Sequence, residues 1–312
     1  MSRRDPLAET LAHLSAARAN PHAPGAVETL RRALADRSNL VVARAAEIVA
    51  EWELAEAAPD LMAAFDRFMI DPARRDPTCA AKIALAEALL RLDAGDAEHF
   101  RRGLGHIQPE PVWGGTQDTA APLRAICAVG LARANPPDVL LDLAGLLADP
   151  EADARAGAAR AIAAAGRPGG AALLWFKVRA GDVEVGPLAE CFAGLLALEP
   201  ERAVAFVGGY LEADSAALAE AAALALGRSG LAAAAPLLRD AWQTAGDPGR
   251  RQPFLRALAL LGDEAAFAFL LELVASGPAG DARDALAALA VIDDRRLRRK
   301  IDRAAAGLGA RG

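Results

Sequence analysis

The stretch Asp149–Gly166, DPEADARAGAARAIAAAG, carries the start, body and end signals of one helix. Asp149 suits the N-cap position, because its carboxylate can accept hydrogen bonds from free amides of the first turn. Pro150 suits the first helical position, and Gly166 suits the left-handed residue that follows a helix. Alanines fall on one helix face, at positions 154, 158, 161 and 165. The stretch therefore predicts a short amphipathic helix over 150–165.

Similar helix ends recur along the chain at steps of 31 or 32 residues. They fall at Gly166, Leu198, Gly230, Gly262 and Asp293. A period of this size is typical of a solenoid whose repeat is a pair of helices. No alternating β-branched runs stand out, so we expect almost no strand. We predict an all-α fold, an α-solenoid or superhelix of about eight antiparallel helix pairs.

The predicted starts of the second helices also repeat. Asp-Pro opens the second helix at positions 76, 149 and 247. A basic residue follows an aspartate by six positions in three copies, and the six residues concerned are Asp76, Lys82, Asp118, Arg124, Asp149 and Arg155.

This pattern of Asp-Pro, a basic residue and alanine-rich turns resembles the second helix of a HEAT repeat, in the short form also found in phycobilin lyases. The resemblance spans roughly 26–293, and its closest copies are DPEADARAGAARAIAAAG and DSAALAEAAALALGRSG. It implies an armadillo-like superhelix. It also implies that the six aspartate and basic residues above form a structural ladder between neighbouring repeats.

We expect residues 1–312 to form a single HEAT-like repeat domain. Residues 1–25 are predicted to be an N-terminal cap helix and turn, 26–293 the repeats, and 294–312 a basic capping helix and tail. The rhythm is interrupted once, at 108–118, where QPEPVWGGTQD contains two prolines, two glycines and a tryptophan. This composition excludes ordinary helix interior and predicts an inserted, structured loop.

The loop 108–118 is the first candidate for a binding site, because insertions in repeat proteins often lie on the binding face. Trp113 could be a partner-binding residue together with Gly114, Gly115 and Gln117, since tryptophan is common at binding hot spots. Alternatively, Trp113 could fold back and plug the widened gap between repeats. Gly114–Thr116 lacks the strand and the GK[ST] ending of a phosphate-binding loop. Asp118 is interpreted as the N-cap of the next helix.

The C-terminal segment DRRLRRKIDRAAAG provides a second, weaker candidate, with Arg295 and Arg299 as possible contacts to an acidic partner. A solvated cap explains most of this charge and is the favoured interpretation. Elsewhere, the three cysteines lie singly in apolar helices, and His99 and His106 are about two turns apart, too far to share a metal ion. We predict no metal, cofactor or catalytic residue.

The chain is 54% hydrophobic and 4% aromatic, with a net charge of −6. The negative balance argues against a protein that grips nucleic acid through phosphates. No apolar run is long enough for a membrane span, and the N-terminus lacks the apolar core of a signal peptide. We therefore expect a cytoplasmic protein, and the excess of Arg over Lys with abundant Ala, Gly and Pro indicates a GC-rich bacterial genome.

Three enzyme families use stacked HEAT-type repeats. Deoxyhypusine hydroxylases have His-Glu pairs that this sequence lacks. An alkylpurine DNA glycosylase or a phycobilin-lyase-like protein that binds a chromophore and a partner remains an alternative. The favoured hypothesis is a non-enzymatic scaffold or interaction module that binds another protein through a concave solenoid face and the 108–118 loop.

Overall fold

We describe the fold from a computed structural model, which covers residues 6–21 and 23–306. Parts of the predicted N-terminal cap segment, 1–25, and of the C-terminal tail, 294–312, lie outside these residues. The chain divides into two compact units, Met1–Arg167 and Pro168–Gly312, and each is described by itself.

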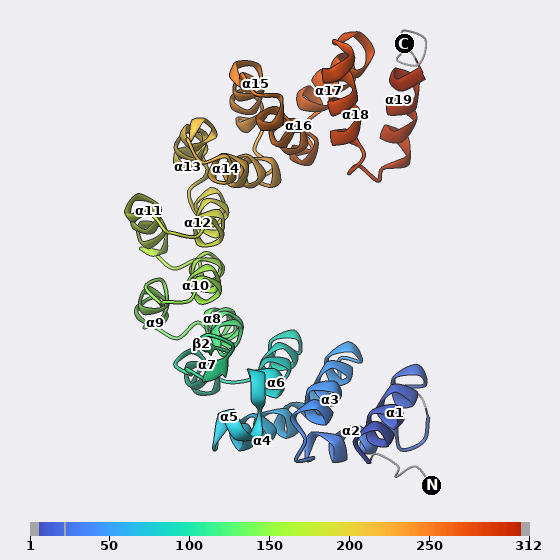
Figure 1. The fold of residues 1–312 in the computed structure, drawn as a ribbon, viewed down its shortest axis with the longest axis vertical. Helices are drawn as coiled ribbons and strands as arrows, with labels where there is room; N and C mark the ends of the chain where they lie inside the picture. Colours follow the sequence, from blue (N-terminus) through green and yellow to red (C-terminus); the bar gives the residue numbers. More distant parts are fainter. Residues whose placement is uncertain (1–5, 22, 307–312) are drawn as a thin grey trace. The chain divides into compact units, whose positions relative to one another are not determined.

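The first unit is a stack of helix pairs that follows one helix at the N-terminal end (Figure 1). Its helices are α1 (Pro6–Ala19), α2 (Ala26–Leu34), α3 (Asn39–Glu51), α4 (Ala58–Phe68), α5 (Pro72–Arg75), α6 (Ala80–Arg91), α7 (Ala97–Leu104), α8 (Ala121–Ala134), α9 (Val139–Leu146) and α10 (Ala152–Ala165). Short 3-10 turns lie at Ala55–Ala57 and Pro77–Cys79.

The second unit repeats the same plan. Its helices are α11 (Gly170–Ala180), α12 (Val185–Leu198), α13 (Pro200–Gly208), α14 (Ala216–Arg228), α15 (Ala234–Thr244), α16 (Pro248–Leu261), α17 (Glu264–Ser276), α18 (Ala279–Leu289) and α19 (Arg295–Ala306), with a 3-10 turn at Gly209–Glu212. Within the described residues the two units contain eight helix pairs, and the prediction of an all-α solenoid is confirmed.

The second helix of each pair packs against the second helix of its neighbour. In the first unit α3, α6, α8 and α10 follow one another in contact, and in the second unit α12, α14, α16 and α18 do the same. Alanine permits this close packing. The predicted alanine face of α10 is buried, at positions 154, 158, 161 and 165. The burial of these small side chains, rather than a few large ones, forms much of the core.

The start of α10 differs from the prediction. The helix begins at Ala152, its N-cap position is Glu151, and no side chain caps it. Asp149 therefore is not the N-cap residue; its carboxylate accepts a hydrogen bond from the Glu151 amide at 2.8 Å in the turn before the helix. Gly166 does adopt the left-handed conformation after the helix, with φ of 58°.

The prediction of a second helix beginning at Asp76 is also wrong in detail. Pro72–Arg75 forms a short helix, Pro77–Cys79 a 3-10 turn, and the long helix α6 starts only at Ala80. In contrast, Asp247 caps α16 as expected, since its carboxylate accepts a hydrogen bond from the Gly249 amide at 2.9 Å.

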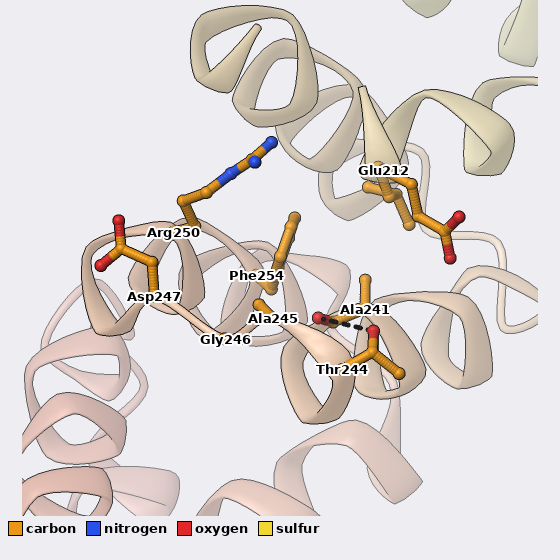
Figure 2. Close-up of a pocket in the computed structure, with 9 residues that line it drawn as sticks. Glu212, Ala241, Thr244, Ala245, Gly246, Asp247, Arg250 and Phe254 are labelled. Atoms are coloured by element: carbon orange, nitrogen blue, oxygen red, sulfur yellow. Dashed lines mark hydrogen bonds between the residues drawn. The ribbon is translucent and has the colours of Figure 1, made fainter. Parts of the chain in front are cut away.

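A cavity of about 330 Å³ lies in the second unit beside the start of α16 (Figure 2). Two of its three charged groups serve local structure. Arg250 donates to the carbonyl oxygen of Ala213, and Asp247 caps its helix. Ala241, Ala245 and Gly246 supply no reactive group, so we interpret this cavity as a packing gap between helices.

Candidate functional site

The insertion between α7 and α8 is a β-hairpin rather than an irregular loop. Strand β1 (Pro109–Val112) pairs antiparallel with β2 (Gly115–Asp118), with Pro109 opposite Asp118 and Val112 opposite Gly115. Trp113 and Gly114 form the two-residue turn. Gly114 has φ of 91°, a conformation that residues with a side chain rarely adopt. The sequence correctly predicted an interruption of the helical repeats at 108–118, but it did not predict that this segment pairs as a β-hairpin.

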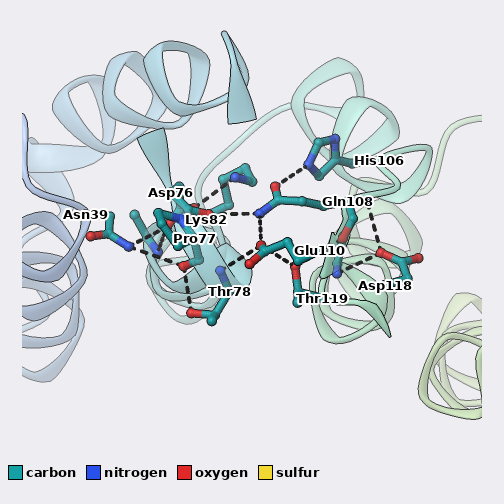
Figure 3. A network of polar contacts seen from close by, with 12 residues as sticks. Asn39, Asp76, Pro77, Thr78, Lys82, His106, Gln108, Glu110, Asp118 and Thr119 are labelled. Atoms are coloured by element: carbon teal, nitrogen blue, oxygen red, sulfur yellow. Dashed lines mark hydrogen bonds and ion pairs between the residues drawn. The ribbon is translucent and has the colours of Figure 1, made fainter. Parts of the chain in front are cut away.

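Gln108 anchors the base of the hairpin. Its side chain is only 1% exposed. Its amide nitrogen Nε2 donates to the carbonyl oxygen of Asp76 at 2.8 Å and to Glu110 Oε1 at 2.6 Å (Figure 3). Its backbone N–H donates to Asp118 Oδ1 at 2.9 Å. The side chain that fills the gap between repeats is therefore Gln108.

Glu110 completes this anchor by tying β1 to the preceding repeat. Its Oε1 accepts hydrogen bonds from the Thr78 backbone N–H at 2.7 Å and from Thr119 Oγ1 at 2.8 Å. Thr78 and Cys79 both have φ near 60°, which is strained for residues with a side chain. Burial alone would raise the pKa of Glu110, but the hydrogen bonds from Gln108, Thr119 and Thr78 outweigh it, and the pKa is lowered.

The predicted ladder residues meet at this edge of the first unit, where the second helices begin. Lys82 Nζ lies 2.9 Å from Asp76 Oδ2, and both side chains are fully buried. Asp76 also accepts hydrogen bonds from the amides of Ala81 and Lys82. Asn39 of the preceding repeat donates to its Oδ1 at 3.1 Å. Asp76 thus holds three segments of chain together.

Arg124 makes the next link. Its Nη1 donates to Asp118 Oδ2 at 2.6 Å, and its Nε and Nη2 donate to the two carboxylate oxygens of Asp149, each at 2.9 Å. Nη1 also donates to the carbonyl oxygen of His106 at 2.9 Å. Arg155 donates to the carbonyl oxygens of Asp149 and Pro150 at 2.8 Å. Arg124 therefore connects the starts of α8 and α10, and Arg155 fixes the turn before α10.

Asp118 differs from its predicted role as the N-cap of α8. The helix begins at Ala121 and its N-cap position is Ala120. Asp118 instead ends β2, accepts a hydrogen bond from the Ala120 amide at 3.0 Å and pairs with Arg124. Burial would raise its pKa, but hydrogen bonds from the Gln108 and Ala120 amides and from Arg124 lower it.

Trp113 does not plug the gap between repeats. Its relative exposure is 104%, the value of a side chain without neighbours. Val112 beside it is 45% exposed, and no atom lies within 4 Å of where a Cβ would stand on Gly114 or Gly115. Gln117 on β2 is exposed as well. The structure therefore places Trp113, Gly114 and Gly115 at an exposed tip, whereas Gln117 lies opposite Glu110, nearer the bonded base.

The two basic residues proposed as a second contact belong to the other unit. Arg295 and Arg299 are exposed on α19, which is held by the buried side chain of Ile301. Arg298 folds back to donate to the carbonyl oxygen of Ile292 at 2.9 Å. The structure thus leaves Arg295 and Arg299 accessible.

The three cysteines are buried, and two of the histidines, His99 and His106, make local hydrogen bonds. Burial raises the pKa of the Cys79 and Cys191 thiols to about 12, so both are protonated near neutral pH. His99 bonds Asp96, and His106 bonds Gln108. Within the described ranges, no group of three or more His, Cys, Asp or Glu side chains has the arrangement of a metal site.

A second cleft, of about 500 Å³, lies in the second unit over the layer of second helices. It is lined by residues of α14, α16 and α18, and Glu220, Gln252, Arg256 and Asp284 give it polar groups of both charges. The sequence did not predict the individual residues of this cleft, because the helical register indicated only the face on which it lies. Over the part of the chain that the structure describes, no helix is long and apolar enough to cross a membrane.

Comparison with solved structures finds low similarity over long alignments. The complex of CpcE and CpcF of phycocyanin lyase from Nostoc sp. PCC7120 is 16% identical, with 90% of this chain and 94% of that chain covered and a TM-score of 0.40. Human deoxyhypusine hydroxylase in complex with glycerol is 17% identical, with 92% and 91% covered and a TM-score of 0.28. An engineered protein is 18% identical, with 99% and 97% covered and a TM-score of 0.39.

Similarity at these TM-scores supports no inference about function. No curated protein sequence matches the chain. The family model for HEAT repeats does match, over residues 210–290. This segment contains α14–α18 of the second unit. The predicted resemblance to HEAT repeats is therefore confirmed over residues 210–290.

Proposed function

We propose that the protein is a non-enzymatic interaction module that binds another protein, with Trp113 at the tip of the hairpin as its main contact. The observation that carries this proposal is the combination of a fully exposed indole with a base that is buried and hydrogen-bonded. Burial of a large aromatic side chain against a partner is favourable, and a side chain held at the tip of an anchored hairpin is available for it.

The anchored base favours binding because it limits the entropy that a partner must overcome. Gln108 and Glu110 together bond Asp76, Thr78 and Thr119, so the strands are held before any partner arrives. A preorganised element loses less conformational freedom on binding than a mobile loop. Gly114 and Gly115 leave the backbone accessible to a partner.

The layer of second helices supplies further surface. The cleft over α14, α16 and α18 lies in the segment that matches HEAT repeats, and repeat proteins commonly bind partners along extended surfaces. Arg295 and Arg299 would add contacts to acidic groups of the partner. We propose no catalytic role for the hairpin, because Glu110 and Asp118 are occupied by structural hydrogen bonds.

The proposal is tested by affinity capture from a lysate of the source organism, followed by titration of the purified partner. Trp113→Ala should weaken binding by about 2 kcal/mol, roughly 30-fold, as expected for an interface hot spot. Folding should be unaffected, because the Trp113 side chain is fully exposed and contributes no buried surface to the fold.

Phe176→Ala is the matched control, since Phe176 is an exposed aromatic residue on α11, at 71%. It should leave the affinity unchanged. Equal affinity of wild type and Trp113→Ala for the captured partner would contradict the proposed role of the hairpin tip.

A further inference from the structure

An arginine-lined cleft in the first unit is separate from the hairpin contacts described above. It has a volume of about 600 Å³ and is lined by Arg37, Arg67, Phe68, Asp71, Arg74 and Arg75. The residues come from the α2–α3 connection, the end of α4, and the α5 segment. Four of the six carry a positive charge and one a negative charge, so the cleft is strongly cationic in a protein of net charge −6.

Arg67 is the half-buried residue of this set. Its Nη2 donates to the carbonyl oxygens of Leu34 at 2.7 Å and Asp36 at 3.1 Å, and its guanidinium lies 5.2 Å from the centre of the Phe68 ring. These contacts fix the side chain without neutralising it. Burial, together with the nearby charge of Arg75, lowers the pKa of Arg67, although Asp36 opposes the effect.

The other arginines have little local compensation. Among the residues that the structure describes, no hydrogen bond or ion pair is made by the side chains of Arg37 and Arg75. Arg74 has one contact with Asp71, at 3.8 Å and largely exposed to solvent. Repulsion between these guanidinium groups is unfavourable, and an anion bound among them would relieve it.

We propose that this cleft binds a small molecule bearing phosphoryl groups. Guanidinium groups form bidentate hydrogen bonds with phosphate oxygens. A terminal phosphoryl group presents three acceptor oxygens in a tetrahedral arrangement, whereas a carboxylate has two in one plane. The tetrahedral group therefore suits donors contributed by three separate segments. A volume of about 600 Å³ lies in the range of small-molecule sites.

The test is isothermal titration of the full-length protein with inorganic pyrophosphate at low salt. Saturable binding is expected, and Arg37→Gln/Arg75→Gln should weaken it by about tenfold or more, because two charge-assisted hydrogen bonds are removed. Both side chains are exposed, so this variant should keep the circular-dichroism spectrum and unfolding midpoint of the wild type.

Arg91→Gln/Arg228→Gln is the control with the same change of net charge, at exposed positions in the last turns of α6 and α14. It should bind pyrophosphate within about twofold of wild type, since it removes only long-range, screened attraction. Citrate, a carboxylate anion, should bind more weakly than pyrophosphate.

Three results would overturn the proposal. They are the absence of saturable pyrophosphate binding to the wild type, an equal loss of affinity in the two double variants, and citrate binding as tight as that of pyrophosphate. Each of these results is independent of the Trp113 titration, because none of the bonds described above joins a residue of the cleft to the hairpin tip.

Discussion

At the scale of single residues, Arg124 shows how a buried charge can join repeats. Its guanidinium is 2% exposed and contacts two carboxylates, one from the end of β2 and one from the turn before α10. A charge removed from water is costly unless its partners compensate it. Here both carboxylates and the His106 carbonyl group do so, and the geometry requires all three to stay in place.

Arg124→Met should therefore destabilise the protein by about 3–5 kcal/mol, the usual result of breaking a buried pair and leaving charge uncompensated. Urea unfolding followed by circular dichroism measures the change. Arg32→Met, at an exposed pair with Glu28 on α2, should cost less than about 1 kcal/mol. Similar losses in the two variants would show that Arg124 has no special structural role.

At the scale of elements, the contact between α8 and α10 depends on small residues. Gly157 on α10 lies so close to α8 that a Cβ on it would stand 2.4 Å from the Cα of Ala125. The neighbour is backbone and cannot rotate away. The distance between these two helices is thus set by the absence of a single side chain.

Gly157→Ala should destabilise the protein by about 1–3 kcal/mol through overpacking, although alanine is the better helix former by about 1 kcal/mol. Gly145→Ala on α9 is the control, because nothing lies within 4 Å of the added Cβ. There the helix preference acts alone, and the variant should be as stable as wild type or slightly more so. Thermal unfolding of both variants measures these changes in stability. Stabilisation by Gly157→Ala would contradict the close approach of α10 to α8.

The hairpin should respond to acid. The pKa values of Glu110 and Asp118 are both lowered in the folded protein. Their stabilising effect is therefore complete above the ordinary carboxyl values, about 3.9 for Asp and 4.3 for Glu. It is lost as the pH falls through the lower, folded-state values. Acidification below about pH 4 should weaken the bonds to Thr78 and Gln108 and loosen the hairpin.

Hydrogen exchange of the Thr78 amide, corrected for its intrinsic pH dependence, measures this effect. Protection should decrease below pH 4 in the wild type. In Glu110→Gln the hairpin should be less protected already at pH 7, and its remaining pH dependence should be smaller. Protection that does not change with pH in the wild type would exclude a role for the carboxylates.

At the scale of the whole molecule, repeats interact with their neighbours, so destabilisation should spread locally. Stability in repeat proteins is approximately a sum of repeat and nearest-neighbour terms. Arg124→Met should therefore increase exchange of amides in α6, α8 and α10 of the first unit far more than in α16 and α18 of the second. Hydrogen exchange read by mass spectrometry tests this, and a uniform increase across both units would indicate one cooperative structure instead.

The sequence by itself determined the helices and their pairing into repeats. Apolar periodicity and glycine ends are local signals, and they placed the ends of α10, α12, α14 and α16 near Gly166, Leu198, Gly230 and Gly262, as the structure has them. Where the bounds were wrong, before α6 and α10, the aspartates also bond other segments of the chain. Asp76 accepts a hydrogen bond from Asn39 as well as from the first amides of α6. Asp149 accepts hydrogen bonds from Arg124 of α8. The sequence around an aspartate does not show which of several hydrogen-bond donors its carboxylate will bind in the folded protein.

Only the tertiary structure decided the hairpin, the direction of Trp113 and the composition of the arginine cleft. The bond between Thr78 and Glu110 joins residues 32 positions apart, and the bonds from Arg67 to Leu34 and Asp36 span 33 and 31 positions. The Arg74–Arg75 doublet is visible in the sequence, but its neighbours are not. Helices form through contacts within one or two turns, whereas these sites form only when neighbouring repeats stack and bring distant polar groups to the same edge.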